Sequence, residues 1–147
     1  MNTGRTYQQI GRESEAIVVN RLIKRGYSVS SPVFGNERYD LIIDDGEALF
    51  RGQVKTAYDR TDRENAVKCD FDTTVYGSDG NPTKTYYEEG EIDCFLIYSP
   101  SHDSVLWIPF EDAPRTCITV SFRDPSDVDS RTRHSVNFAD DYLLTDG

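Results

Sequence analysis

Hydrophobic and polar positions in the first part of the chain follow two different periods. Residues 6–25 repeat apolar positions with the spacing of an amphipathic helix, and Gly26 follows where such a helix would end. Residues 27–30 read as a short strand, and the stretch 38–57 holds two strand-like runs joined by the tight turn DDGEA. The sequence therefore predicts one helix followed by three strands.

The rest of the chain is a series of shorter segments. Residues 67–76 and 83–87 predict a hairpin or long loop around GSDGNP, and residues 124–135 predict a polar loop. Further strands are expected in CFLIYSP, VLWIPF and CITVSF, and a short closing helix in FADDYLL. This order favours an α/β fold, with a central mixed β-sheet flanked by helices.

Length and cysteine content limit the classes of protein that fit. A chain of 147 residues is expected to form a single domain, residues 1–147, with a real core. The sequence lacks both an apolar run long enough for a membrane span and a recognisable signal peptide, so a soluble, cytoplasmic protein is expected. Cys69, Cys94 and Cys117 lack any CxxC pairing and are expected to be buried free thiols.

Net charge is acidic, which normally argues against a nucleic-acid partner. The chain carries 16 basic and 26 acidic residues, a net charge of −10, with 12 Arg against 4 Lys and 17 Asp against 9 Glu. Such a surface suits a halophilic host, in which acidity serves solvation. What matters is then whether cations gather at one place in the fold.

The predicted helix carries a carboxylate among its apolar residues. At about 100° per residue, Val18, Val19 and Leu22 fall within about 60° of Glu15, whereas Glu13 lies about 160° away. We therefore expect Glu15 to project from the middle of the apolar stripe, where an unpaired carboxylate is costly. The helix alone leaves open a functional Glu15 or a side chain that extends to solvent.

The two runs within 38–57 carry polar side chains at alternating positions. One face of the second run holds Arg51, Gln53 and Lys55, and its other face holds Phe50, Gly52, Val54 and Thr56. On the first run, Arg38, Asp40 and Ile42 share a face opposite Tyr39, Leu41 and Ile43. Pairing through the short turn can bring Asp40 close to Gln53 and Lys55. A plain Asp–Lys pair on a solvated face is the simpler alternative.

Taken together, these residues form a set of hard oxygen donors. The carboxylates of Glu15 and Asp40, the amide carbonyl of Gln53 and the backbone carbonyl of Val54 suit Mg²⁺, with Mn²⁺ able to substitute. Lys55 beside them can bind a scissile phosphate, lower the pKa of an attacking water or stabilise developing negative charge. Phosphodiester hydrolysis is the reaction that these groups fit best.

The same residues resemble a known family. G-x-x-x-E at residues 11–15, a Gly-Tyr after the helix, the Asp of YDLIID and QVK at residues 53–55 are similar to the PD-(D/E)XK nuclease superfamily. The arrangement most resembles the homing endonucleases encoded by group I introns, and archaeal Holliday-junction resolvases are more distant. The match covers residues 11–57, with a weaker echo in YYEEGEIDCFLIYSP and VLWIPF.

The resemblance implies a restriction-endonuclease-like core and specific roles. Asp40 would be the central metal ligand, Glu15 would bind the metal directly or through water, and Lys55 would be the catalytic lysine. Gln53 stands where most of the superfamily has Glu or Asp, and a neutral ligand holds a divalent ion less strongly. Similar intron-encoded enzymes also carry Gln there. Tyr39 replaces the usual proline before the aspartate.

Cations near this motif are candidates for contacts with double-stranded DNA. Arg38 and Arg51 share strand faces with Asp40 and Gln53, and further candidates follow the second strand: Tyr58, Arg60, Arg63 and Lys68. Acidic residues interleave with Arg60 and Arg63, so a salt-bridged surface loop is an equal alternative for these two.

Two classes of function therefore remain. The first is a Mg²⁺-dependent DNA endonuclease; the second is a nuclease-fold module that binds DNA or assembles without cutting, with a DNA-junction resolvase as a further variant. A homodimer or homotetramer is expected, because one metal site cuts one strand. Ile10 and Ile17 lie on the side of the helix away from the predicted stripe. They are candidates for subunit contacts, and packing under the FADDYLL segment is the alternative.

Overall fold

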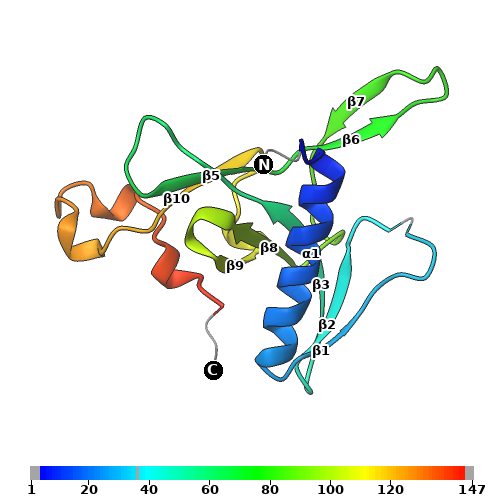
Figure 1. Ribbon diagram of the computed structural model, residues 1–147, viewed down its shortest axis with the longest axis horizontal. Helices are drawn as coiled ribbons and strands as arrows, with labels where there is room; N and C mark the ends of the chain where they lie inside the picture. The colour runs from blue at the N-terminus through cyan, green and yellow to red at the C-terminus, as the bar shows by residue number, and fades with distance from the viewer. Residues whose placement is uncertain (1–3, 36, 145–147) are drawn as a thin grey trace.

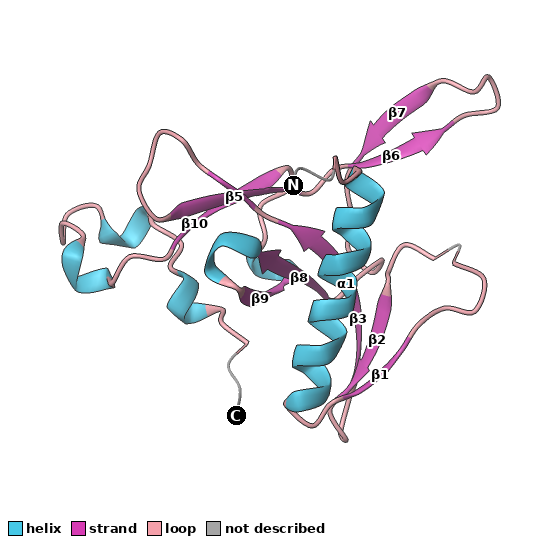
Figure 2. Ribbon diagram, in the orientation of Figure 1, coloured by secondary structure: helices cyan, strands magenta, loops and turns pink. Residues whose placement is uncertain are grey.

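The computed structural model describes residues 4–35 and 37–144, which form one long α-helix, ten strands and several short 3-10 turns (Figures 1 and 2). The helix α1 spans Tyr7–Lys24. The strands are β1 (Ser28–Ser30), β2 (Leu41–Asp44), β3 (Leu49–Thr56), β4 (Tyr58–Asp59), β5 (Ala66–Asp70), β6 (Thr73–Tyr76), β7 (Pro82–Thr85), β8 (Cys94–Ser99), β9 (Ser104–Pro109) and β10 (Cys117–Ser121).

Local signals define both ends of α1. The Thr6 hydroxyl accepts a hydrogen bond from the Gln9 backbone N–H, and the Gln9 side chain accepts one from the Thr6 N–H, which satisfies two otherwise unpaired donors. At the other end Gly26 adopts a φ of +91°, a left-handed conformation that glycine reaches without a steric penalty. The predicted helix over residues 6–25 is confirmed.

The central sheet is mixed and has the strand order β1-β2-β3-β8-β9. Strands β2 and β3 pair antiparallel through the predicted tight turn, β8 and β9 pair antiparallel, and β3 and β8 pair parallel. A parallel pair needs a long crossover. The chain between β3 and β8 provides it and, on the way, forms β4, β5 and the β6–β7 hairpin.

Two hydrophobic clusters lie on opposite faces of this sheet. On the first face α1 contributes Val18 and Leu22, which pack with sheet residues such as Val54, Leu96 and Val105. The second cluster joins sheet residues Phe95, Ile97, Leu106 and Ile108 to Val67, Cys69, Ile118 and Val120 of a smaller sheet with the order β10-β5-β4. A helix therefore covers one face and strands cover the other, where flanking helices were expected on the basis of sequence.

The buried stripe of α1 differs from the predicted one. Its fully buried residues are Ser14, Val18 and Leu22, which places Glu15 about 60° from the centre of the stripe rather than in its middle. Glu15 is half-buried. Ile17 is half-buried and packs against the helix-side cluster, to which Leu144 of the C-terminal segment also belongs. Its role in subunit contacts stays a prediction.

The shift has a polar cause. The Ser14 and Thr56 hydroxyls lie 2.6 Å apart and share a hydrogen bond between α1 and β3, so a serine occupies a position that hydrophobicity alone would not assign to the core. Ser14 is only 1% exposed. Burial of a hydroxyl is tolerated where a partner satisfies it.

Two other predictions need correction, and a third is narrowed. Tyr39 packs against the second cluster although Leu41 and Ile43 belong to the first, because β2 begins only at Leu41 and alternation does not extend back to residue 39. The hairpin around GSDGNP is β6–β7 alone, since β5 pairs with β4 and β10. The short helix expected in FADDYLL is a 3-10 helix limited to Ala139–Asp141.

The expected free thiols are confirmed. Cys69 and Cys94 are buried and Cys117 is half-buried, and none of the three is in a disulfide. Burial raises the pKa of the Cys69 and Cys94 thiols to about 12, so both are protonated and inert at neutral pH. Within residues 4–35 and 37–144, no helix combines the length and hydropathy needed to cross a membrane.

The Ser14–Thr56 bond gives a stability prediction. Ser14→Ala should lower the free energy of unfolding by about 1 kcal/mol, because it removes a buried hydrogen bond and leaves Thr56 without this partner. The double variant Ser14→Ala/Thr56→Val should lose less than the sum of the single variants, as measured by urea denaturation. Strict additivity of the two losses would mean that the hydroxyls do not interact. Ser28→Ala, on the exposed β1, is the control.

Candidate active site

The centre of the site is the point where β2 and β3 begin to pair. The Asp40 N–H donates to the Gly52 carbonyl at 2.9 Å, which extends the β2–β3 register by one residue and sets Asp40 opposite Gln53. The Asp40 Oδ2 accepts a hydrogen bond from the Val54 N–H at 3.1 Å. Backbone and side chain of Asp40 are thus both fixed to the same strand.

Glu15 approaches this carboxylate from α1. Burial, and then the negative charge of Asp40, raise the pKa of Glu15. Burial also raises the pKa of Asp40, against the smaller opposing effects of the Val54 hydrogen bond and the Lys55 ammonium. A carboxylate whose ionisation is disfavoured by burial and by the negative charge of a second carboxylate marks a place where a cation is stabilised.

Gln53 contributes an acceptor that none of the described residues satisfies. Among the described residues its Oε1 is buried and has no hydrogen-bond partner. An orphaned buried acceptor costs about 1–3 kcal/mol unless a ligand, water or ion pairs with it. The neighbouring carboxylates suggest what kind of partner this oxygen suits, which is a cation.

Lys55 follows on the same face of β3. Its Nζ donates to the Asp72 carbonyl at 2.9 Å and lies over the Tyr87 ring, 5.5 Å from the centroid. Burial lowers the pKa of Lys55, and the negative charges of its neighbours, Asp40 among them, raise it in part. The sequence-based expectation that the strand pair brings Asp40, Gln53 and Lys55 together is therefore met by the backbone register and by these interactions.

The donor set fits a hard divalent cation. Glu15 and Asp40 carry carboxylate oxygens, and Gln53 carries an amide oxygen that has no hydrogen-bond partner among the described residues. Oxygen donors of this kind are the ones that Mg²⁺ prefers. The residues present thus satisfy the chemical requirement for such an ion.

The two arginines expected near the cut are each held by acidic partners. Arg38 forms an ion pair with Glu91 at 2.8 Å, donates to the Tyr86 carbonyl at 3.0 Å, and lies 4.5 Å from the Tyr87 ring centroid. The Arg51 Nε lies 3.3 Å from Asp93, and its guanidinium also donates to the Gly90 carbonyl. Arg38 therefore lies beside Lys55, whereas Arg51 is tied to the residues that lead into β8.

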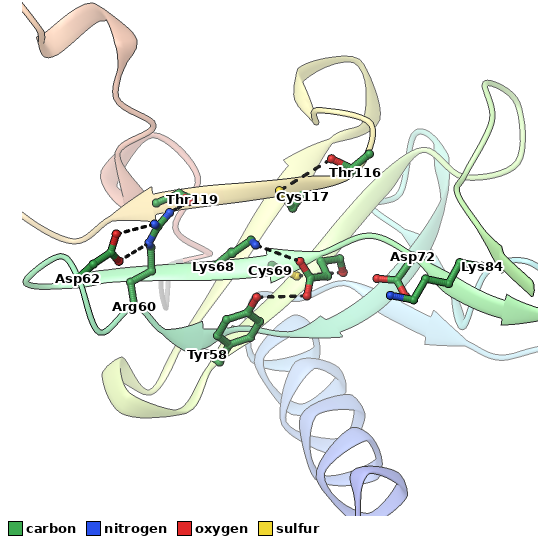
Figure 3. A network of polar contacts seen from close by, with 11 residues as sticks. Tyr58, Arg60, Asp62, Lys68, Cys69, Asp72, Lys84, Thr116, Cys117 and Thr119 are labelled. Atoms are coloured by element: carbon green, nitrogen blue, oxygen red, sulfur yellow. Dashed lines mark hydrogen bonds and ion pairs between the residues drawn. The ribbon is translucent and has the colours of Figure 1, made fainter.

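The remaining DNA-binding candidates lie on the smaller sheet and its loop (Figure 3). Tyr58 donates to Asp70 at 3.2 Å, and Lys68 forms an ion pair with the same carboxylate at 3.7 Å. Arg60 pairs with Asp62 at 2.8 Å and donates to the Thr119 hydroxyl at 2.8 Å.

Arg63 is exposed and lines a cavity of about 430 Å³, together with Arg123, Thr119 and Ser121 of the β10 region. These positions place the second group of candidates on a different sheet from Asp40 and Lys55. Their role in binding DNA stays a prediction.

Sequence reasoning missed the groups that surround Lys55. The Asp72 contact uses a backbone carbonyl, which leaves no signal in the side-chain pattern. Tyr87 precedes the glutamates and the core strand of YYEEGEIDCFLIYSP. It is only 6% exposed, so Tyr87 belongs to the core and not to a surface loop. An aromatic residue before a core strand was the available signal.

Comparison with known proteins agrees with this arrangement. The sequence profile of the PD-(D/E)XK endonuclease family matches residues 5–145. The fold is similar to that of a bacterial homing endonuclease, I-Ssp6803I, with a TM-score of 0.73 and 18% sequence identity over 95% of this chain and 89% of the other. None of the curated proteins matches the sequence at a significant level.

The profile match spans nearly the whole chain, and the positions that carry the motif are those that the fold gathers at the start of the β2–β3 pairing. Both observations lead to one assignment: this chain belongs to the PD-(D/E)XK endonuclease family.

Proposed function

We propose that the protein is a Mg²⁺-dependent DNA endonuclease that hydrolyses phosphodiester bonds, with Mn²⁺ able to replace Mg²⁺. One observation carries the proposal: a buried, unpartnered Gln53 oxygen lies on the same strand pair as the Asp40 carboxylate and the Lys55 ammonium. Membership of the PD-(D/E)XK endonuclease family supports the reaction class.

Glu15, Asp40, Gln53 and the Val54 carbonyl would hold the metal ion. When bound, the ion polarises a phosphate oxygen and lowers the pKa of a water that can attack phosphorus. The chain's own contribution is to hold these oxygens in place, since the Val54 N–H fixes Asp40 before any ion arrives. Ligands that need no rearrangement favour rapid and selective binding.

Lys55 would act directly on the phosphate. Its ammonium is partly desolvated, and a desolvated cation stabilises developing negative charge more strongly than one in water. We assign it the role of stabilising the charge that forms on the phosphate oxygens in the transition state. Arg38, beside it, would bind an adjacent phosphate.

Double-stranded DNA is the proposed substrate, and a homodimer or homotetramer is the proposed assembly. The Arg and Lys candidates Arg38, Arg51, Arg60, Arg63 and Lys68, with Tyr58, would contact the backbone. A single metal centre cuts one strand at a time, so two subunits related by a two-fold axis are the simplest route to a double-strand cut.

Asp40→Ala and Lys55→Ala should each reduce plasmid cleavage by at least about a hundredfold, because both act in the transition state. DNA binding, measured by fluorescence anisotropy in EDTA, should stay within a few-fold of wild type. Glu13→Gln is the matched control on α1, because Glu13 is exposed and pairs with Arg5. Nicking is to be compared in Mg²⁺, Mn²⁺ and EDTA; full cutting by either alanine variant would exclude the proposed roles.

Gln53→Glu should be tolerated and should lower the Mg²⁺ concentration needed for half-maximal cleavage, since an anionic oxygen holds a divalent ion more strongly than an amide. Gln8→Glu, on the exposed part of α1, adds the same charge away from the site and should leave the midpoint unchanged. A dead Gln53→Glu protein with intact folding would instead mean that the Gln53 NH₂ group donates an essential hydrogen bond.

A further inference from the structure

The ammonium of Lys55 contacts two residues at the base of the β6–β7 hairpin. Asp72, which directly precedes β6, accepts its hydrogen bond at 2.9 Å. Tyr87, which follows β7 by two residues, presents its ring 5.5 Å from Nζ. The hairpin extends away from the body of the protein, so these contacts lie where it joins the core (Figure 1).

The Tyr87 ring is itself rigidly held. It is 6% exposed and meets the Phe95 ring edge-to-face, with centroids 5.4 Å apart and an interplanar angle of 83°. Phe95 in turn stacks on Phe71, the residue before Asp72, at 4.0 Å. A ring fixed on the core strand β8 therefore determines where a cation can lie over it.

Two cations use this one ring. The Arg38 Cζ lies 4.5 Å and the Lys55 Nζ 5.5 Å from the Tyr87 centroid, both within the range of a cation–π interaction. An aromatic face attracts a cation without taking up its positive charge in an ion pair. Lys55 can thus be fixed in direction while its charge stays available, which a carboxylate partner at the same place would not allow.

We propose that Tyr87 is a positioning residue of the active site, whose ring aims the Lys55 ammonium and the Arg38 guanidinium at the scissile phosphate. This role rests on the proposed nuclease function and adds to it a group outside the metal-ligand and lysine motif. Tyr87 touches neither the substrate nor the metal ligands in this scheme; it acts through the two cations.

The test varies the electron density of the ring at nearly constant shape. Tyr87→Phe keeps the ring and should cleave DNA within about twofold of wild type. Fluorinated phenylalanines at position 87 weaken the cation–π attraction in steps. The trifluorinated form should lower the single-turnover rate at saturating DNA by about tenfold, which corresponds to about 1.4 kcal/mol in the activation free energy. Affinity for DNA in EDTA should change far less than the rate.

The matched control is trifluorinated phenylalanine at position 110. Phe110 packs on the same Phe95 ring, with centroids 6.3 Å apart. Among the described residues the cation–π contacts are made to Tyr86 and Tyr87 and not to Phe110. This control should cleave at the wild-type rate. Thermal unfolding midpoints of all variants should agree within a few degrees, because the fluorinated rings differ little in volume.

Two results would overturn the proposal in different ways. A wild-type protein that cuts while the fluorinated series at position 87 shows a constant rate would remove the role of Tyr87 and leave the nuclease function intact. A wild-type protein that cuts no DNA with Mg²⁺ or Mn²⁺ would remove the nuclease function and the role of Tyr87 together.

Discussion

The site depends on the hydrogen bond from the Val54 N–H to the Asp40 carboxylate. With the backbone bond from Asp40 to Gly52 it sets the register of β2 on β3, and a slip of one residue would turn Gln53 and Lys55 to the opposite face. Because β3 also pairs in parallel with β8, the same register is tied to the strand that carries Phe95. These two bonds and the β3–β8 pairing therefore align the proposed metal ligands and Lys55 with Phe95, on which the Tyr87 ring packs.

The acidity of the protein is compatible with a DNA substrate, because arginines near the site can exchange their carboxylate partners for a phosphate. Arg38, Arg51 and Arg60 lie in ion pairs with Glu91, Asp93 and Asp62. Ion pairs at exposed and partly exposed positions contribute little to stability, so a phosphate can compete for the guanidinium at little cost. Until then the acidic partners hold the arginines in place, and a bound divalent ion would offset the charge of Glu15 and Asp40.

The helix, the tight turn and the polar face of β3 could be predicted from sequence because each is a local pattern. The capping residues of α1 and the alternation Arg51-Gln53-Lys55 need no knowledge of the rest of the fold. The phase of α1 could not be predicted, since the burial of Ser14 depends on Thr56, which is 42 residues away in sequence. The same limit applies to Lys55, whose partners at Asp72 and Tyr87 come from a crossover that the pattern describes only as a hairpin or long loop.

We propose that Glu15, Asp40, Gln53 and Val54 form one divalent-metal site. Paramagnetic broadening of backbone amide signals by substoichiometric Mn²⁺ tests it without requiring cleavage. We expect broadening centred on the amides of Asp40, Gln53 and Val54, displaced by excess Mg²⁺ and abolished by Asp40→Asn. Broadening centred elsewhere in the chain, or unchanged in the Asp40→Asn variant, would show that these residues do not form the metal site.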